Sequence, residues 1–297
     1  MPKESFKQPI KKEPPIKEMK EKLDKAEKMV EEVEERWKDK IEEFEMVEKS
    51  VKELKKLWEE NEEKVKGKFN DEVFLFFSSL PLPETSSFLL ERISNKFLKE
   101  FDWKKFKKGG DLDLFLSVFL NKNTKNYISS QKEKGIEEEN IKPIEVHLNV
   151  KELPVLFNYL GYQNPKKLHL IIEGDCGWNI GERMQGGKII VKGNCGSHTG
   201  LGMQDGKIIV EKNCGKYTGE RMQGGEIVVE GNCDDCTGDD MQGGELNIKR
   251  EVKSFFRSAF YSYNHGTIIW KGIKIWENGN WTKEGKEMWE KGEIPVE

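Results

Sequence analysis

The sequence predicts an α+β protein of several domains: an N-terminal coiled-coil helix, a small helical domain, and a C-terminal β-helix (solenoid) of 19-residue repeats that ends in a hairpin and a helix. Three observations carry this prediction. Apolar residues recur every seven positions between residues 19 and 66. Helical stripes interrupted by proline and glycine occupy residues 67–140. Four consecutive copies of one 19-residue unit occupy residues 170–245.

The composition of the chain limits the classes of function. Hydrophobic and charged residues each make up 35% of the 297 residues, so part of the chain is not expected to have a globular core of its own. A net charge of -4 favours neither nucleic acid nor an anionic membrane. There is no signal peptide and no long apolar run, and five cysteines suit a reducing compartment. We therefore expect a soluble, cytoplasmic protein without a membrane partner.

Residues 1–18 are rich in lysine and proline and are predicted to be a disordered lead-in to one helix over residues 19–66. Its heptad a positions are Leu23, Val30, Trp37, Phe44, Val51, Trp58 and Val65. Its d positions are Ala26, Val33, Val47 and Leu54, with Lys40 and Asn61 as polar exceptions. One register over this length predicts a coiled coil that joins the chain to itself, as a homo-oligomer, or to a partner protein. The alternative is a single amphipathic helix packed on its own chain.

The domain at residues 67–140 is predicted to contain three helices, which are Asp71–Leu80, Glu84–Phe101 and Asp111–Lys134. The stretch at residues 101–108 interleaves aromatic residues with lysines, a pattern that could hold single-stranded nucleic acid. Lysines near a helix C-terminus are also favoured by the helix dipole. The second explanation is preferred, so a nucleic-acid partner is not expected.

Residues 141–250 are assigned to the β-helix domain. Val146, Leu148 and Val150 alternate with polar residues, which predicts a strand. Glu152–Leu160 is predicted to be a short helix that could cap the first rung. The repeats themselves begin at Leu170.

Five columns of the repeat are invariant. One is the glycine column Gly187, Gly206, Gly225 and Gly244, and the other four contain cysteine, glycine, methionine and glutamine. These four are Cys176, Cys195, Cys214 and Cys233; Gly181, Gly200, Gly219 and Gly238; Met184, Met203, Met222 and Met241; and Gln185, Gln204, Gln223 and Gln242. Short strands followed by glycine turns predict β-helix rungs with the methionines inside. The glutamines can form a ladder of amide hydrogen bonds. A second ladder is expected at a turn, from Asp175, Asn194, Asn213 and Asn232.

The cysteine column could indicate a metal or redox site. Four thiols in register lie in a line, however, whereas zinc requires ligands that converge on one point. We therefore place these cysteines in the core and predict no metal, no cofactor and no catalytic residue. Cys236 lies off this column, in line with Asn179, His198 and Tyr217, and is a possible reactive thiol. A hydrolase or redox enzyme that uses Cys236 is the corresponding alternative function.

Residues 251–297 are predicted to form a C-terminal cap. Thr267–Trp281 has the pattern of a hairpin with a turn at Asn278-Gly279, and Lys283–Lys291 that of a short helix. The tryptophans of this region are expected to close the last rung and protect its edge. The alternative is a surface that binds a partner protein.

The repeats resemble a known family. Residues 181–196 and 219–234 read GERMQGGKIIVKGNCG and GERMQGGEIVVEGNCD. They are similar to the GXGXG repeats at the C-terminal end of the large subunit of glutamate synthase and to those of the β-helical subunit of formylmethanofuran dehydrogenase. Asp205, Lys212 and Asp234 replace glycines of the pattern. The resemblance covers about 80 residues, 168–248, and implies a right-handed β-helix that serves as a scaffold for catalytic domains.

These features together favour a non-catalytic structural protein. The coiled coil and the solenoid are both elements of assembly, and the sequence contains no recognisable catalytic constellation. The family resemblance favours an alternative, which is an accessory subunit of an oxidoreductase or amidotransferase complex. The scaffold is the preferred expectation.

Overall fold

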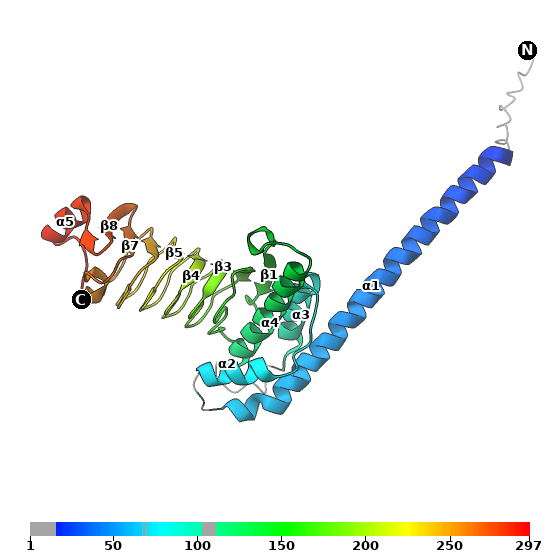
Figure 1. Cartoon of the computed structure of the whole chain (residues 1–297), viewed down its shortest axis with the longest axis horizontal. Coiled ribbons are helices and arrows are strands. Elements are labelled where there is room, and N and C mark those ends of the chain that lie inside the picture. Colours follow the sequence, from blue (N-terminus) through cyan, green and yellow to red (C-terminus); the bar gives the residue numbers. More distant parts are fainter. Residues whose placement is uncertain (1–15, 67, 69, 103–110) are drawn as a thin grey trace, which may run out of the picture. The chain divides into compact units, whose positions relative to one another are not determined.

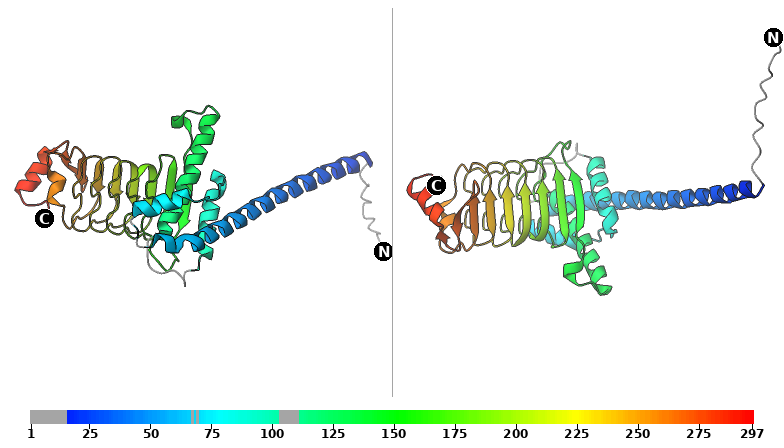
Figure 2. Two further views of the ribbon diagram at one scale, coloured as in Figure 1. Left: turned by 60° about the horizontal axis from the view of Figure 1, so that its bottom comes forward. Right: turned by 90° about the horizontal axis from the view of Figure 1, so that it is seen from above.

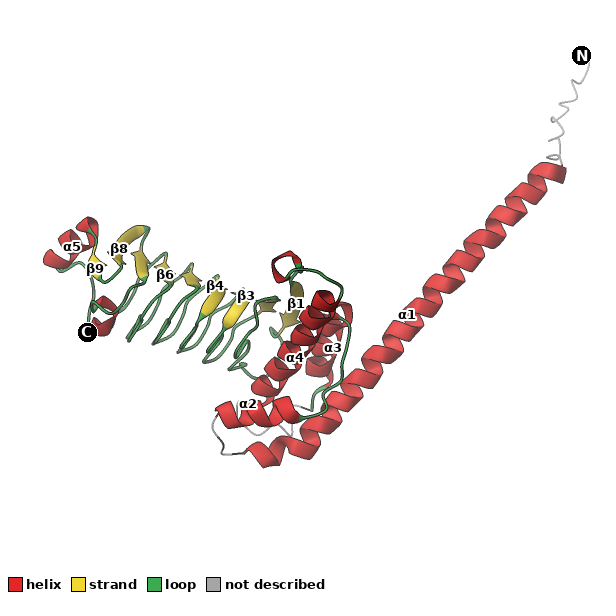
Figure 3. Ribbon diagram, viewed as in Figure 1, coloured by secondary structure: helices red, strands yellow, loops and turns green. Residues whose placement is uncertain are grey.

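The computed structural model describes residues 16–66, 68, 70–102 and 111–297 (Figure 1). The N-terminal lead-in up to residue 15 and most of the aromatic and lysine-rich stretch therefore lie outside the described residues. The chain divides into two compact units, Met1–Glu48 and Lys49–Glu297. The predicted fold class is confirmed, because helices precede a parallel β-solenoid that ends in a hairpin and a helix (Figure 3).

The helical part contains the long helix and the three shorter helices predicted for it. They are α1 (Ile16–Val65), α2 (Asn70–Ser79), α3 (Ser87–Glu100) and α4 (Asp111–Glu133). From Val47 to Val65 the heptad stripe of α1 is buried, and Trp58 packs against Phe77 of α2 and Phe115 of α4. In this half of α1, the stripe belongs to the core of its own chain, as the single-helix alternative requires.

The solenoid is a stack of parallel strands joined in sequence order (Figure 2). Its strands are β1 (Ile144–Asn149), β2 (Leu168–Glu173), β3 (Gln185–Val191), β4 (Asp205–Val210), β5 (Glu226–Val229), β6 (Glu245–Ile248) and β7 (Thr267–Trp270). From β2 to β6 each paired residue faces the residue 19 positions further along the chain, as Lys188 faces Lys207. The exception is Gln185, which faces Asp205 at an irregularity of β3. One sequence repeat therefore makes one rung.

The interior of the solenoid is built from matching side chains of successive rungs. The methionine column is fully buried, and so are the isoleucine, leucine and valine positions of the strands that face inward. The cysteine column is also buried. The glycines of the column that starts at Gly181 all have positive φ, and a Cβ on Gly181 would also lie 2.5 Å from Cδ1 of Ile208. Positive φ, combined with close packing at Gly181 and Gly200, therefore accounts for this invariant column.

The two predicted ladders have different outcomes. The asparagine ladder exists, because Oδ1 of Asp175 accepts the backbone N–H of Asn194 at 2.7 Å and Asn194 does the same for Asn213 at 3.2 Å. The glutamine side chains instead lie at the surface, and within the described residues no hydrogen bond joins them. The backbone N–H of Gln204 bonds to the carbonyl oxygen of Met184 at 2.9 Å, so the main chain links the rungs at this column.

The predicted helix over Glu152–Leu160 is wrong. These residues form turns of an additional rung that begins with β1 and lies before the first recognisable repeat. The backbone N–H of Tyr159 bonds to the carbonyl oxygen of Trp178, and the N–H of Gly177 bonds to that of Phe157. Pairing with the neighbouring rung thus replaces the local hydrogen bonds of a helix.

Helix α3 covers the open edge of β1. Glu91 accepts the backbone N–H of His147 at 3.0 Å. Asn95, one turn further along α3, donates to the carbonyl oxygen of His147 and accepts the N–H of Asn149. These side chains make the hydrogen bonds that a further strand would make, so the edge has no free row of backbone groups.

Helix α4 does the same for the turn of this first rung. Asp113, Ser117 and Asn121 are spaced four residues apart on one side of the helix, and all three are buried. They bond to the backbone of Asn158, Tyr159, Gly161, Tyr162 and Gln163. The predicted cap of the solenoid therefore exists, but it comes from the helical domain and not from residues 152–160.

The other end of the solenoid is closed by the predicted hairpin and helix, which are β8 (Ile273–Glu277), β9 (Asn280–Trp281) and α5 (Lys283–Glu290). β8 pairs antiparallel with β7 and with β9. The indole N–H of Trp270 donates to the carbonyl oxygen of Arg250, and that of Trp276 to the carbonyl oxygen of Asn264. Both tryptophans are buried, in agreement with their expected role in closing the last rung.

We predict that Asn121→Ala destabilises the protein by about 1–3 kcal/mol, because the substitution leaves the buried carbonyl oxygens of Tyr162 and Gln163 without a donor. Chemical denaturation of the full chain measures this change. The matched control is Asn126→Ala, at an exposed position of the same helix, which should change stability by less than about 0.5 kcal/mol. Equal effects of the two substitutions would contradict the capping role of α4.

Candidate functional site

One corner of the solenoid gathers the side chains with most potential for chemistry. Asn179, His198, Tyr217 and Cys236 occupy equivalent positions in successive rungs, and each has a φ between 58° and 61°. Non-glycine residues rarely adopt this left-handed conformation. We call these four residues the polar corner. Strained residues are often retained for a function, so their contacts are described in turn.

His198 and Tyr217 form the centre of the polar corner. Their rings are stacked with centroids 4.9 Å apart and planes 1° apart. Nδ1 of His198 lies 2.7 Å from Oε2 of Glu220, a carboxylate that is largely buried. A hydrogen bond with Cys236 raises the pKa of Tyr217. From His198 to Cys236, each side chain of the column therefore contacts the side chain of the next rung.

Cys236 is held as a neutral thiol. Its Sγ donates to Oε1 of Glu297 at 2.9 Å, and its backbone N–H donates to the same oxygen at 2.9 Å. Burial and the neighbouring carboxylate of Glu297 raise the pKa of the thiol. A nucleophilic cysteine needs the opposite environment, in which a positive group stabilises the thiolate.

The polar corner does not assemble a catalytic pair of cysteine and histidine. His198 belongs to the rung two positions before Cys236, and Tyr217 lies in the rung between them. The nearest partners of Cys236 are a carboxylate and a tyrosine. The hydrogen bond with Tyr217 lowers the pKa of the thiol, but burial and the carboxylate of Glu297 outweigh it, and the pKa is raised. The possible reactive thiol therefore has no activating base among its described neighbours.

The adjacent column of the same corner anchors helix α2. Asp71 accepts hydrogen bonds from the hydroxyl of Tyr162 and from the guanidinium of Arg183. The hydrogen bond from Tyr162 and the charge of Arg183 lower the pKa of Asp71. Burial and the hydrogen bond to Asp71 raise the pKa of Tyr162. These contacts make this part of the corner a structural joint.

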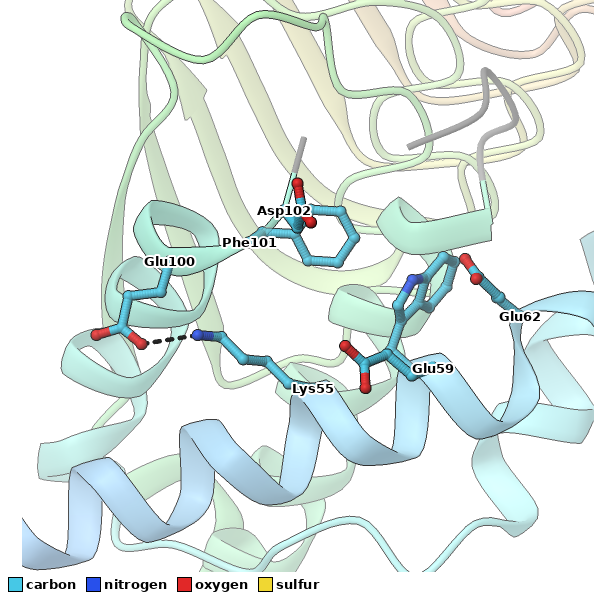
Figure 4. A pocket seen from close by; sticks show the side chains of 7 residues that line it. Lys55, Glu59, Glu62, Glu100, Phe101 and Asp102 are labelled. Carbon is cyan, nitrogen blue, oxygen red and sulfur yellow. Dashed lines mark hydrogen bonds and ion pairs between the residues drawn. The ribbon is translucent and has the colours of Figure 1, made fainter. Parts of the chain in front are cut away.

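A pocket of about 250 Å³ lies between the C-terminal part of α1 and the end of α3 (Figure 4). Its lining residues are Lys55, Trp58, Glu59, Glu62, Glu100, Phe101 and Asp102. The α1 members follow the spacing i, i+3, i+4 and i+7, which places them on one face of the helix. Nζ of Lys55 pairs with Oε2 of Glu100 at 2.7 Å, and this contact lowers the pKa of Glu100.

The pocket combines aromatic rings with an excess of carboxylates. Trp58 and Phe101 lie with ring centroids 6.2 Å apart, and four acidic residues surround a single lysine. Such a lining suits a positively charged group. Among the described lining residues there is no serine, threonine, cysteine or histidine, so they offer no hydroxyl, thiol or imidazole nucleophile.

The cysteine column has the environment of a core. A hydrogen bond with Cys214 and burial raise the pKa of Cys195 and of Cys233, whereas hydrogen bonds from these two neighbours lower the pKa of Cys214 against its burial. In the parts of the chain that the structure describes, no group of three or more His, Cys, Asp or Glu side chains could hold a metal ion. None of the described helices is long and apolar enough to cross a membrane.

The alignment of Cys236 with Asn179, His198 and Tyr217 was visible in the sequence, because all four occupy the same repeat position. The partners Glu220 and Glu297 were not, since they come from another column and from the C-terminal segment. The pocket at α1 was also missed. Its only sequence signal is the i, i+3, i+4, i+7 spacing that starts at Lys55, within a helix where such spacings are common.

Comparison of the chain with protein-family models, with curated proteins and with solved structures finds no match. The architecture is that of a β-solenoid of about five turns with a spacing of about 19 residues. No family assignment follows from these comparisons.

We predict that Glu297→Gln accelerates alkylation of Cys236 by iodoacetamide at neutral pH by several-fold. Removal of the carboxylate lowers the pKa of the thiol, and more thiolate is then present at a given pH. Mass spectrometry of the folded protein measures the labelling rate as a function of pH. Glu293→Gln, at an exposed position of the same segment, is the control and should leave the rate unchanged. A labelling profile of Glu297→Gln identical to that of the unmodified protein would contradict the assignment.

Proposed function

We propose that this protein is a non-catalytic, cytoplasmic scaffold, in which the N-terminal part of α1 pairs with that of a second copy and the solenoid provides a rigid platform. We call residues 16–48 of α1 the arm. The proposal concerns assembly and not chemistry. It is favoured by the polar corner, where the thiol is neutral and the histidine lies two rungs away from it.

The observation that carries the proposal is the change of environment along one heptad register. The a and d positions from Val47 onward have exposed fractions of 5% or less. In the arm, the d position Val33 is 49% exposed, and the a positions Val30 and Phe44 are 56% and 58% exposed. Burial of such a side chain contributes about 1.5–3 kcal/mol. An apolar stripe that continues past the core of its own chain is typical of a surface that pairs with another helix.

The solenoid supplies the platform because its rungs are linked along their whole perimeter. Strands pair in register from β1 to β7, and the turns are joined by backbone hydrogen bonds and by the asparagine ladder. Both ends are closed, by α3 and α4 at one end and by β8 and α5 at the other. A body with protected ends can present its lateral faces to partners without self-association of its strand edges.

We predict that the full chain is a dimer and that Val30→Asp together with Val33→Asp converts it into a monomer. Two carboxylates in an apolar seam would have to be desolvated, so the dimer should weaken by at least about a hundredfold. Sedimentation equilibrium over a range of protein concentrations measures the molar mass.

Lys28→Glu is the matched control, because it also makes the arm more negative by two charges but lies at position f, on the side away from the seam. This variant should remain a dimer. A chain that is monomeric before any substitution would contradict the proposal.

A second candidate is an accessory subunit of an oxidoreductase or amidotransferase complex. The observation in its favour is the match of the 19-residue rungs to the GXGXG pattern, of which residues 181–187 and 219–225 are the fullest copies. In the protein families that this pattern resembles, the β-helix packs against catalytic domains.

We predict that, under this second candidate, affinity purification from the native source recovers a partner with bound flavin, an iron–sulfur cluster or molybdopterin. Absorbance spectroscopy and metal analysis of the eluate detect these groups. The variant with Val30→Asp and Val33→Asp serves as a control, because a partner that binds the solenoid should be retained. Recovery of the chain alone would argue against this candidate.

A further inference from the structure

The buried cysteine column contains thiols that the proposed scaffold does not use. Cys195, Cys214 and Cys233 occupy one repeat position in successive rungs, and all three are free thiols. We call these three residues the thiol row. We infer that the thiol row binds one soft monovalent cation, of the Cu(I) type, between two neighbouring sulfur atoms. The inference goes beyond the proposed scaffold and does not depend on the arm.

The thiols of the row lie in adjacent rungs at the same register. The backbone N–H of Cys195 bonds to the carbonyl oxygen of Asn213, that of Cys214 bonds to the carbonyl oxygen of Asn232, and Cys214 pairs with Cys233 in a parallel bridge. Parallel strands repeat at about 4.8 Å, so equivalent sulfur atoms are on the order of 4–5 Å apart. The thiols of Cys195 and Cys233 each form a hydrogen bond with that of Cys214. Cys214 is therefore the neighbour that the other two share.

This linear arrangement excludes zinc but suits an ion with two ligands. Zinc requires four ligands that converge on one point. Cu(I), which has a filled d shell, is stable between two collinear sulfur ligands, and thiolates select it over harder ions. A metal–thiolate bond is about 2.3 Å long, so an ion midway between two adjacent sulfur atoms reaches both of them without movement of the strands.

The surroundings of the row determine the charge that the site can accept. The methionine column is fully buried, and so are Thr199, Thr218 and Thr237 beside the thiols. The hydroxyls of these threonines donate to main-chain carbonyl oxygens at 2.9–3.1 Å. A net charge in such an interior is costly. A monovalent ion that bonds to one thiolate and to the sulfur of one neutral thiol releases a single proton to the solvent, and the occupied pair then has no net charge.

Cys176 begins the same column but lies outside the thiol row. It raises the pKa of Cys195 only through its charge, whereas Cys214 does so through a hydrogen bond. Ile180 also stands where the later rungs have a threonine. The hydrogen bond with Cys214 and burial keep the pKa of Cys195 high, so an incoming ion must displace a bound proton. The affinity for the ion should therefore rise with pH.

The thiol row lies nearer to the solvent than the other interior columns. Its three cysteines are 4–5% exposed, whereas the methionines of the same rungs are 0% exposed. Local opening of one turn is a small fluctuation compared with global unfolding. A small ion can therefore reach the row while the rest of the stack remains folded.

The full chain with Cys236→Ser, which removes the partly exposed thiol, tests the site with Cu(I) added anaerobically. Native mass spectrometry after removal of excess metal should show one retained ion. X-ray absorption at the copper edge should show two sulfur neighbours in a linear arrangement. The affinity, measured by competition with a Cu(I) chelator, should rise about tenfold per pH unit because one proton is displaced. Absence of retained copper, or three or more sulfur neighbours, would overturn the inference.

Two substitutions at equivalent positions provide the matched comparison. Cys214→Ser in the same background should lose the ion, because no adjacent pair of thiols then remains in the row. Cys176→Ser makes the same chemical change outside the row and should retain it. Equal copper retention by these two variants would contradict the assignment. Circular dichroism verifies the solenoid, and if Cys214→Ser does not fold, Cys195→Ser combined with Cys233→Ser isolates Cys214 and tests the same loss.

Discussion

The open first rung of a β-solenoid imposes the constraint on which the rest of this protein depends. A stack of parallel strands satisfies the backbone of every rung except the first and the last, whose groups have no neighbour on one side. Here the missing partner of β1 is supplied by the side chains of Glu91 and Asn95, and that of the adjacent turn by Asp113, Ser117 and Asn121. These hydrogen bonds join the helices to the solenoid. Neither part alone could provide partners for all of its polar groups at this end. These contacts give the helical domain a structural role at the start of the repeats.

Among the side chains that join the helical domain to the first rung, Asp113 is the most deeply buried acid. Asp113 accepts the backbone N–H of Asn158 at 2.6 Å, and burial raises the pKa of its carboxyl well above the ordinary value. The folded state therefore binds this proton more strongly than the unfolded chain does. Its contribution to stability is complete below the ordinary pKa of an aspartate and decreases as the pH rises toward the raised value. The attachment of the helical domain thus loses the contribution of Asp113 as the pH rises through the raised pKa of this carboxyl.

The sequence predicted those parts of the fold in which a pattern recurs, and it failed where a contact occurs once. The exact period of 19 residues predicted that each repeat forms one rung. The inward columns of methionine and cysteine followed from this prediction. The rung before the first repeat has no such pattern, so Glu152–Leu160 was taken for a helix although Tyr159 pairs with the next rung. The heptads predicted a long helix, but periodicity alone could not reveal that Val51 and Trp58 are buried by their own chain. At the polar corner, the column of Cys236 could be read from the repeat, whereas the carboxylate of Glu297 that keeps it neutral could not.

Apart from the irregularity at Gln185, the offset of 19 residues between β2 and β6 divides the solenoid into equal steps. The two closures differ in sequence from the rungs between them, and they contact the rungs at opposite ends of the stack. Loss or gain of one unit would change the separation of the closures by one strand spacing, about 4.8 Å, and leave both of them intact. Length could therefore evolve in equal steps, independently of how either end is attached.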